Sequence, residues 1–552
     1  MRYFRNPQFL FVAMLCLPIA AWAQGGRAGR AAAAAAQQSG APANPTGRGG
    51  APTASTGAAS DFFIYDTAAS GGMAISDAPP AESHQKITAN GESLAYTVRV
   101  GYQPLRNATT GQTVAHLFYS SYTKEGVSDE STRPVVFFLG GAPGVAATWQ
   151  EFGGFAPKRM KWASDGTAGE PPYGWSDNAN TPLVQADLVF VNPVGTAFSR
   201  PDHPGQGAGF WNTAGDIASL AEFVRTFVNT NNRRNSPLFL AGEDSGTGRV
   251  AGLAAFLTEH EIPVRGVVLL SMTTSPDAAA GDAEYITMLP SFVMAAWYHK
   301  KLAPELSSMS AEQISGQARQ FASREYLHAL YKGDRMTADE HAKVLADMSR
   351  LTGLSKPFLI NNNLRVTLDR FSGELMRDPR RGLSNSDSRV SGFVPAAGGG
   401  RGGRGGRGGF GVPAMAIDFN LSNLAGGFQT AYEAYLRKEL TFNGNSNGVF
   451  YLSNGGVGAF TSTGSDDASL AAAFARDPHL RLFVGVNYFD LGSPFYATEY
   501  SLAHLSVSPE VRAHNITVSH FEAGQMAYVD SKASVRLQAD LGRFISEATS
   551  RK

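Results

Sequence analysis

The sequence predicts an α/β protein with a mostly parallel central sheet, helices on both faces of that sheet, and a largely helical cap insertion. Three observations support this fold class. Short, nearly continuous apolar runs recur along the chain, as in buried parallel strands. Segments with apolar residues at helical spacing lie between these runs. From 285 to 440 the strand pattern fades and helical patterns replace it, which is typical of an insertion over the carboxyl ends of the strands.

Predicted strands and helices alternate along the chain. Apolar runs predict buried strands at 135–139, 188–191, 238–241, 267–270 and 482–486. Helical spacing predicts helices that include 217–228, 250–258 and 537–545, and the insertion has helical patterns at 311–331 and 338–351. This alternation predicts a parallel sheet that is covered on both faces.

The first 60 residues predict export. Arg2 and Arg5 precede an apolar run and a small-residue pattern that ends at Ala23, so we expect a signal peptide at 1–23. Residues 24–60 have the composition of a disordered leader. We therefore expect a periplasmic or extracellular protein without a membrane anchor after cleavage. Its folded part is predicted to contain core segments at 61–284 and 441–552 and the cap insertion at 285–440.

Charge and cysteine content exclude several classes of function. Lys plus Arg and Asp plus Glu both number 47, so there is no basic field for a polyanion. The Gly/Arg-rich loop at 398–409 has three arginines and one flanking aromatic residue, and we expect no nucleic-acid partner. Cys16 is the only cysteine and lies in the predicted signal peptide, so the mature chain forms no internal disulfide. No histidine lies at ligand spacing in the motif blocks, so we expect no metal and no cofactor.

The most informative segment is 236–249, in which a predicted strand runs into a turn between two glycines and then into a helix. Gly242 and Gly246 bracket Asp244. A strand, a tight glycine-flanked turn and a helix together form the context of a nucleophile elbow, which exposes its central side chain at the start of the helix.

The block Gly242-Glu243-Asp244-Ser245-Gly246 resembles the Gly-Glu-Ser-Tyr-Gly elbow of the serine carboxypeptidases, with aspartate at the serine position. Further blocks resemble that family in the same order along the chain, at 133–144, 187–200, 488–495 and 521–528. The strand-rich segment 82–123 and the Arg-Pro before the glycine block are similar to the bacterial branch of the family. The resemblance implies an α/β-hydrolase fold.

The resemblance places the catalytic triad at Asp244, Asp490 and Gln525, and only Asp490 keeps the family's residue type. In the family a serine attacks the carbonyl, a histidine takes its proton and an aspartate orients the histidine. A glutamine amide neither accepts nor releases a proton near neutral pH, so Gln525 cannot act as the base. Three alternatives stay open: His520 as a substitute base, Asp244 as the nucleophile, and Ser245 as the nucleophile.

The resemblance also implies a substrate-binding set of Gly141, Ala142, Glu243 and Ser245, of which Glu243 helps to bind a peptide carboxylate in the family. Gly140 replaces the family's asparagine in this region. We therefore expect a catalytically silent protein that keeps a cleft for a peptide or protein ligand. The alternatives are an active carboxypeptidase with a modified mechanism and a surface scaffold that works through its Gly/Arg-rich loops.

Overall fold

The computed structural model describes residues 75, 78–141, 143–163, 166–203, 206–273, 275–377, 381–393, 418–442, 450–453 and 466–550. Every described residue belongs to one compact unit, within 64–552. The predicted signal peptide, leader and Gly/Arg-rich loop lie outside the described residues and stay predictions. A search of the described part of the chain finds no helix with the length and hydropathy to span a membrane.

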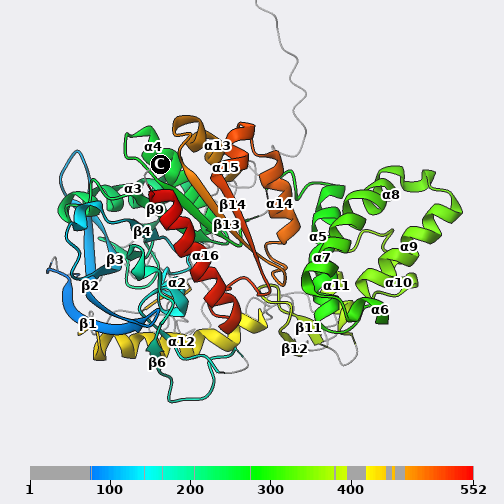
Figure 1. Cartoon of the computed structure of the whole chain (residues 1–552), viewed down its shortest axis with the longest axis horizontal. Coiled ribbons are helices and arrows are strands. Elements are labelled where there is room, and N and C mark those ends of the chain that lie inside the picture. Colours follow the sequence, from blue (N-terminus) through cyan, green and yellow to red (C-terminus); the bar gives the residue numbers. More distant parts are fainter. Residues whose placement is uncertain are drawn as a thin grey trace, which may run out of the picture. The chain divides into compact units, whose positions relative to one another are not determined.

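A ten-stranded sheet forms the centre of the described unit, with the order β1-β2-β3-β7-β4-β9-β10-β13-β14 and β8 paired with β3 (Figure 1). Pairing is antiparallel from β1 to β7 and parallel from β7 to β14. The strands are β1 (Ala81–Ala89), β2 (Glu92–Arg106), β3 (Thr113–Lys124), β4 (Val135–Phe138), β7 (Asp187–Val191), β8 (Arg200–Pro201), β9 (Leu238–Glu243), β10 (Gly266–Leu270), β13 (Arg481–Asn487) and β14 (Ile516–Phe521). The five predicted buried strands all lie in the parallel part of this sheet.

Side chains of the parallel strands alternate between two apolar layers, as the two-residue period of a strand requires. In β4, Val135 and Phe137 pack into one layer, whereas Val136 and Phe138 pack into the other. The first layer contains α3 (Thr213–Thr230) and α4 (Gly246–Glu259), and the second contains α16 (Ser531–Thr549). Helices therefore cover both faces of the sheet, which confirms the predicted fold class.

The insertion after β10 begins with a group of helices that pack on one another (Figure 1). The helix α5 contacts α7, α8, α9 and α11. The elements are α5 (Asp282–Tyr298), α6 (Pro304–Ser307), α7 (Ala311–Phe321), η5 (Ala322–Tyr326), α8 (Leu327–Lys332), η6 (Gly333–Arg335), α9 (Ala338–Thr352), α10 (Lys356–Asn361) and α11 (Leu368–Leu375), followed by the hairpin of β11 (Arg381–Leu383) and β12 (Ser391–Phe393).

The helix α12 (Phe419–Lys438) lies within the predicted insertion range but packs elsewhere. Its Phe428 stacks on Trp149, and its Tyr435 stacks on Phe152, both of which follow β4. These side chains belong to the apolar layer that contains α16. The helix therefore covers the short elements after β4, which are α2 (Thr148–Gln150), η2 (Glu151–Phe155), β5 (Lys158–Met160) and β6 (Trp175–Asp177).

The remaining elements connect or flank the sheet. They are η1 (Glu130–Thr132), η3 (Pro182–Val184), η4 (Gly207–Gly209), α13 (Asp466–Arg476), α14 (Phe495–His504) and α15 (Pro509–Asn515). The helix α13 packs against α4, and α14 packs against α5. The sequence between β13 and α16 therefore contacts both the sheet and the inserted helices.

Candidate active site

Asp244 sits in the sharp turn between β9 and α4, with φ 51°. Its backbone N–H donates to the carbonyl of Leu270 at 3.0 Å. A Cβ atom at Gly242 would lie 2.5 Å from the Gly246 carbonyl oxygen, and one at Gly246 would lie 2.4 Å from that of Gly140. Only glycine fits at the two flanking positions without a backbone shift, so the local geometry is that of a nucleophile elbow.

The two side chains at the top of the elbow have different environments. Asp244 is partly buried, and burial raises the pKa of its carboxyl, opposed by a hydrogen bond from the Ser245 backbone. The Asp466 carboxylate raises the same pKa further. Ser245 is exposed and is the N-cap residue of α4, where its hydroxyl makes no capping hydrogen bond. The elbow therefore presents a carboxyl group and an exposed hydroxyl on adjacent residues.

Asp490 follows β13 and has a fully buried carboxyl, with 1% of the residue exposed. Its Oδ1 accepts the backbone N–H groups of Gly492 at 2.9 Å and Ser493 at 3.0 Å. Its Oδ2 has no hydrogen-bond partner among the described residues. Burial raises the pKa of this carboxyl well above its ordinary value, and the nearby charge of Asp244 raises it further. The Asp490 carboxyl therefore accepts hydrogen bonds from the backbone of its own turn, and no hydrogen bond joins it to a histidine in the described residues.

The loop that carries Gln525 lies directly beside the loop that carries Asp490. The Phe489 N–H donates to the Ala523 carbonyl at 3.0 Å. Both loops follow the carboxyl ends of neighbouring parallel strands, β13 and β14. In the described residues no hydrogen bond joins the Gln525 amide to the Asp490 carboxyl. The structure brings the two positions to the same edge of the sheet, but it does not link their side chains.

Backbone groups hold Gln525 in place. Its N–H donates to the Ser386 carbonyl at 2.6 Å. Its carbonyl accepts from Ser271 Oγ at 3.0 Å and from Asn487 Nδ2 at 3.1 Å. None of these three hydrogen bonds involves the Gln525 side chain, so another side chain at this position could keep all three.

Glu243 is buried next to the elbow, at the end of β9. Its Oε2 accepts from the Tyr528 hydroxyl at 2.7 Å, whereas its Oε1 has no partner in the described part of the chain. Burial raises the pKa of Glu243 to about 8, and the charges of Asp244 and Asp490 act in the same direction. Glu243 therefore carries a proton near neutral pH. Within the described residues no three His, Cys, Asp or Glu side chains are grouped as metal ligands.

The glycine loop at 139–141 is fixed by Arg249, a residue of α4 that sequence reasoning did not single out. Its Nη1 donates to the Leu139 carbonyl at 3.0 Å and to the Gly141 carbonyl at 2.8 Å. Its Nε forms a buried ion pair with Asp216 of α3 at 2.5 Å. The signal for this role was available, since a buried arginine three residues after Gly246 needs a partner. Ala142, the other predicted substrate-binding position of this loop, lies outside the described residues.

Comparisons with known proteins agree with the fold and the elbow. The sequence pattern of the serine carboxypeptidase family matches residues 92–320, which include the elbow but neither Asp490 nor Gln525. No curated protein sequence matches the chain. Among solved structures, Kex1(delta)p, a prohormone-processing carboxypeptidase from Saccharomyces cerevisiae, matches with a TM-score of 0.52 and 13% identity over 82% of this chain and 91% of that chain.

Two further solved structures match at lower TM-scores. VinJ has a TM-score of 0.33 and 11% identity, over 81% of this chain and 99% of its own. A lipase in its open form has a TM-score of 0.31 and 11% identity, over 85% of this chain and 100% of its own. The bacterial branch and the triad assignments at Asp490 and Gln525 stay predictions. The described unit therefore has the α/β-hydrolase fold, and its residues 92–320 are similar to the serine carboxypeptidase family.

Proposed function

We propose that this protein is an exported, catalytically silent serine carboxypeptidase-like protein that binds a peptide or a protein partner in the cleft beside its elbow. One observation carries the proposal. The buried Asp490 carboxyl has an Oδ2 without a partner, and the neighbouring loop offers Gln525 where the family has the histidine that an aspartate orients. Without that imidazole no group at this position takes a proton from a nucleophile and returns it to a leaving group.

His520 is not available as a substitute base. Its Nε2 lies 2.6 Å from Glu499 Oε1, and the same carboxylate binds the Arg319 guanidinium through both of its oxygens. This ion-pair group joins β14 to α14 and to the inserted helix α7. The His520 ring is therefore engaged in a contact between these three elements, which argues against a role as the base at the elbow.

The alternative function is hydrolysis with Asp244 as the nucleophile. The position of Asp244 in the elbow favours this hypothesis. Asp244 occupies the backbone conformation at which this fold presents a nucleophile. A carboxylate that attacks a substrate carbon forms an ester, and turnover of that ester needs an activated water. The missing base removes this second step. Attack by Ser245 meets the same obstacle, because a neutral hydroxyl also needs a base.

Peptidase assays of the purified protein test the silent site directly. We expect no release of C-terminal residues from blocked dipeptides between pH 4 and 8, measured by mass spectrometry. Turnover that disappears in Asp490→Ala would support the hydrolase alternative and contradict the proposal.

A second experiment tests whether Gln525 stands where the base is needed. The double variant Asp244→Ser, Gln525→His should react with a serine-directed fluorophosphonate probe, whereas each single variant should not, because the serine and the base act as a unit. Ser245→Ala added to the double variant is the matched control and should leave labelling unchanged. Equal labelling of the double variant and Asp244→Ser would show that position 525 is not the base position.

A further inference from the structure

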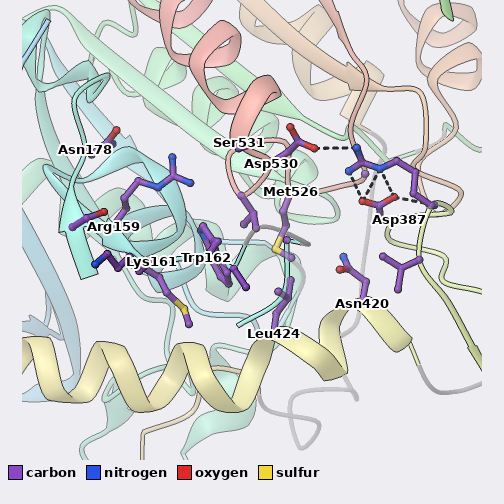
Figure 2. A pocket seen from close by; sticks show the side chains of 18 of the residues that line it. Arg159, Lys161, Trp162, Asn178, Asp387, Asn420, Leu424, Met526, Asp530 and Ser531 are labelled. Atoms are coloured by element: carbon purple, nitrogen blue, oxygen red, sulfur yellow. Dashed lines mark hydrogen bonds and ion pairs between the residues drawn. The ribbon is translucent and has the colours of Figure 1, made fainter. Parts of the chain in front are cut away.

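A cavity of about 750 Å³ borders the Gln525 loop, whose Gly524 and Met526 form part of its wall (Figure 2). Its other walls come from the β5–β6 hairpin, the start of α12 and the start of α16. The volume lies within the usual range for small-molecule sites. Asp244, Glu243 and Asp490 are not among the residues that line it, so the cavity is distinct from the site described above.

The acidic side chains of this cavity are already paired. Asp177 accepts from Lys158 Nζ at 2.6 Å. Asp387 and Asp530 both bind Arg389, at 2.6 Å and 2.9 Å. Figure 2 shows Asp387 and Asp530 on one side of the cavity and Arg159 and Lys161 on the other. Each of these carboxylates therefore has a cationic partner, although Arg389 alone is shared by Asp387 and Asp530, so that group keeps one net negative charge.

Arg159 and Lys161 remain as cations without a carboxylate partner in the described residues. The Arg159 guanidinium makes one long contact, from Nη1 to Ser534 Oγ at 3.4 Å. Burial lowers the pKa of Arg159, as expected for a cation that no anion compensates. The neighbouring Lys158 is not among the residues that line the cavity, and its charge is already paired with Asp177 at 2.6 Å.

The helix N-terminus that borders the cavity is already capped and is not open to an anion. Phosphate sites commonly use the free N–H groups at a helix N-terminus. Here Asp530 Oδ1 accepts the first free N–H groups of α16, from Lys532 and Ala533, both at 2.9 Å. Besides the Lys161 ammonium, the wall offers the planar guanidinium of Arg159, which can bind a carboxylate through two parallel hydrogen bonds.

The apolar part of the wall indicates what the carboxylate is attached to. Trp162, Leu424 and Met526 line the cavity together with the two cations. The Trp162 ring stacks on the Phe428 ring, and its Nε1 donates a hydrogen bond to the Gly153 carbonyl at 3.3 Å. A fixed aromatic wall beside a guanidinium suits a ligand with an apolar side chain and an anionic end.

We propose that this cavity binds the carboxylate of a short peptide with an apolar residue beside it, with Arg159 as the bidentate partner and Lys161 as a second positive charge. The proposal rests on the peptide-binding function inferred above and names a ligand class for it. It also gives this chain a carboxylate partner other than the glycine block, where Gly140 replaces an asparagine.

Calorimetric titration of the purified protein tests the proposal with four probes: N-acetyl-Phe-Leu as the free acid, the same peptide as its C-terminal amide, N-acetyl-Phe-Asp amide, and N-acetyl-leucine. We expect the free acid to bind at least roughly tenfold more tightly than the amide, because a charge-assisted hydrogen bond to a carboxylate is lost in the amide. Arg159→Gln should remove this preference, Arg159→Lys should retain part of it, and Lys161→Gln should reduce it. Lys343→Gln, the same change at an exposed position of α9, is the matched control and should have no effect.

The outcomes separate the cavity from the function. Equal affinity for acid and amide, or a preference that persists in folded Arg159→Gln, overturns the carboxylate site and leaves peptide binding intact. Arg159-dependent binding of N-acetyl-leucine without binding of any peptide retains the site and contradicts the peptide-binding function. Tight binding of N-acetyl-Phe-Asp amide assigns the recognised carboxylate to an acidic side chain. Displacement of the free acid by millimolar inorganic phosphate overturns the preference for carboxylate. If Arg159→Gln unfolds, the Arg159→Lys and Lys161→Gln variants decide.

Discussion

Replacing Glu243 by glutamine should make the stability of this protein less dependent on pH. Glu243 has a folded-state pKa of about 8, raised from an ordinary value of 4.5 by burial. Its Oε2 accepts from Tyr528, and its Oε1 has no partner in the described residues. A glutamine in the same place keeps an acceptor for the tyrosine hydroxyl and has no proton to lose.

The sign of the effect follows from proton linkage. Because the folded state holds the Glu243 proton more tightly than the unfolded state, the group contributes most stability below pH 4.5 and loses that contribution as the pH rises toward 8. The loss is about 1.4 kcal/mol for each pH unit in this window. The unfolding entropy is about 2.1 cal/mol/K per residue, so a unit of the size of 64–552 loses about 1 °C of Tm for each kcal/mol of stability. The loss of stability between pH 5 and 7.5 therefore lowers the Tm by about 3 °C.

Thermal unfolding of the wild type and of Glu243→Gln at a series of pH values measures this difference. We expect the Tm of the wild type to fall more steeply between pH 5 and 7.5, by about 3 °C in total. Glu312→Gln, which changes an exposed glutamate of α7, serves as the control and should run parallel to the wild type. Parallel profiles for the wild type and Glu243→Gln would refute the assignment of a buried, protonated Glu243.

Three further changes test the scaffold of the elbow by thermal or urea unfolding. Arg249→Met should cost about 3 to 5 kcal/mol because it leaves Asp216 as an uncompensated buried charge, and Asp216→Leu added to it should recover much of that loss. Gly246→Ala should prevent stable folding or lower the Tm sharply, since its Cβ would lie 2.4 Å from the Gly140 carbonyl oxygen. Asp244→Val should cost about 1 to 3 kcal/mol at φ 51°, whereas Asp244→Asn, which tolerates this conformation, should be nearly neutral.

The central sheet could be predicted because its buried strands are nearly continuous apolar runs in the sequence. Each parallel strand from β7 to β13 is apolar nearly throughout, since helices cover both faces, and such runs are recognisable in one sequence. The predicted run at 135–139 corresponds to β4, and that at 482–486 lies within β13. The elbow was predictable for a related reason: a strand, two glycines in close spacing and a helix form one local pattern.

The carboxylate cavity could not be predicted in this way, because its walls are short and distant in sequence. The strands β5 and β6 have three residues each, too few to show a period. Arg389 and Asp530, which pair with each other in the wall, are 141 residues apart in the sequence. Composition therefore shows an equal number of acids and bases but not how they pair, and only the fold shows that Arg159 has no carboxylate partner among the described residues.

The way in which the Gln525 loop is held bears on the proposal that this chain binds a ligand without catalysis. Its N–H and carbonyl bind Ser386, Ser271 and Asn487, and all three interactions are independent of the side chain at 525. A histidine can therefore be exchanged for glutamine without moving Gly524 and Met526, which line the neighbouring cavity. Loss of the base stops proton transfer, whereas the wall of the cavity depends only on the backbone. The proposed silent triad is therefore compatible with the proposed binding cavity, because the backbone hydrogen bonds of this loop do not use the side chain at 525.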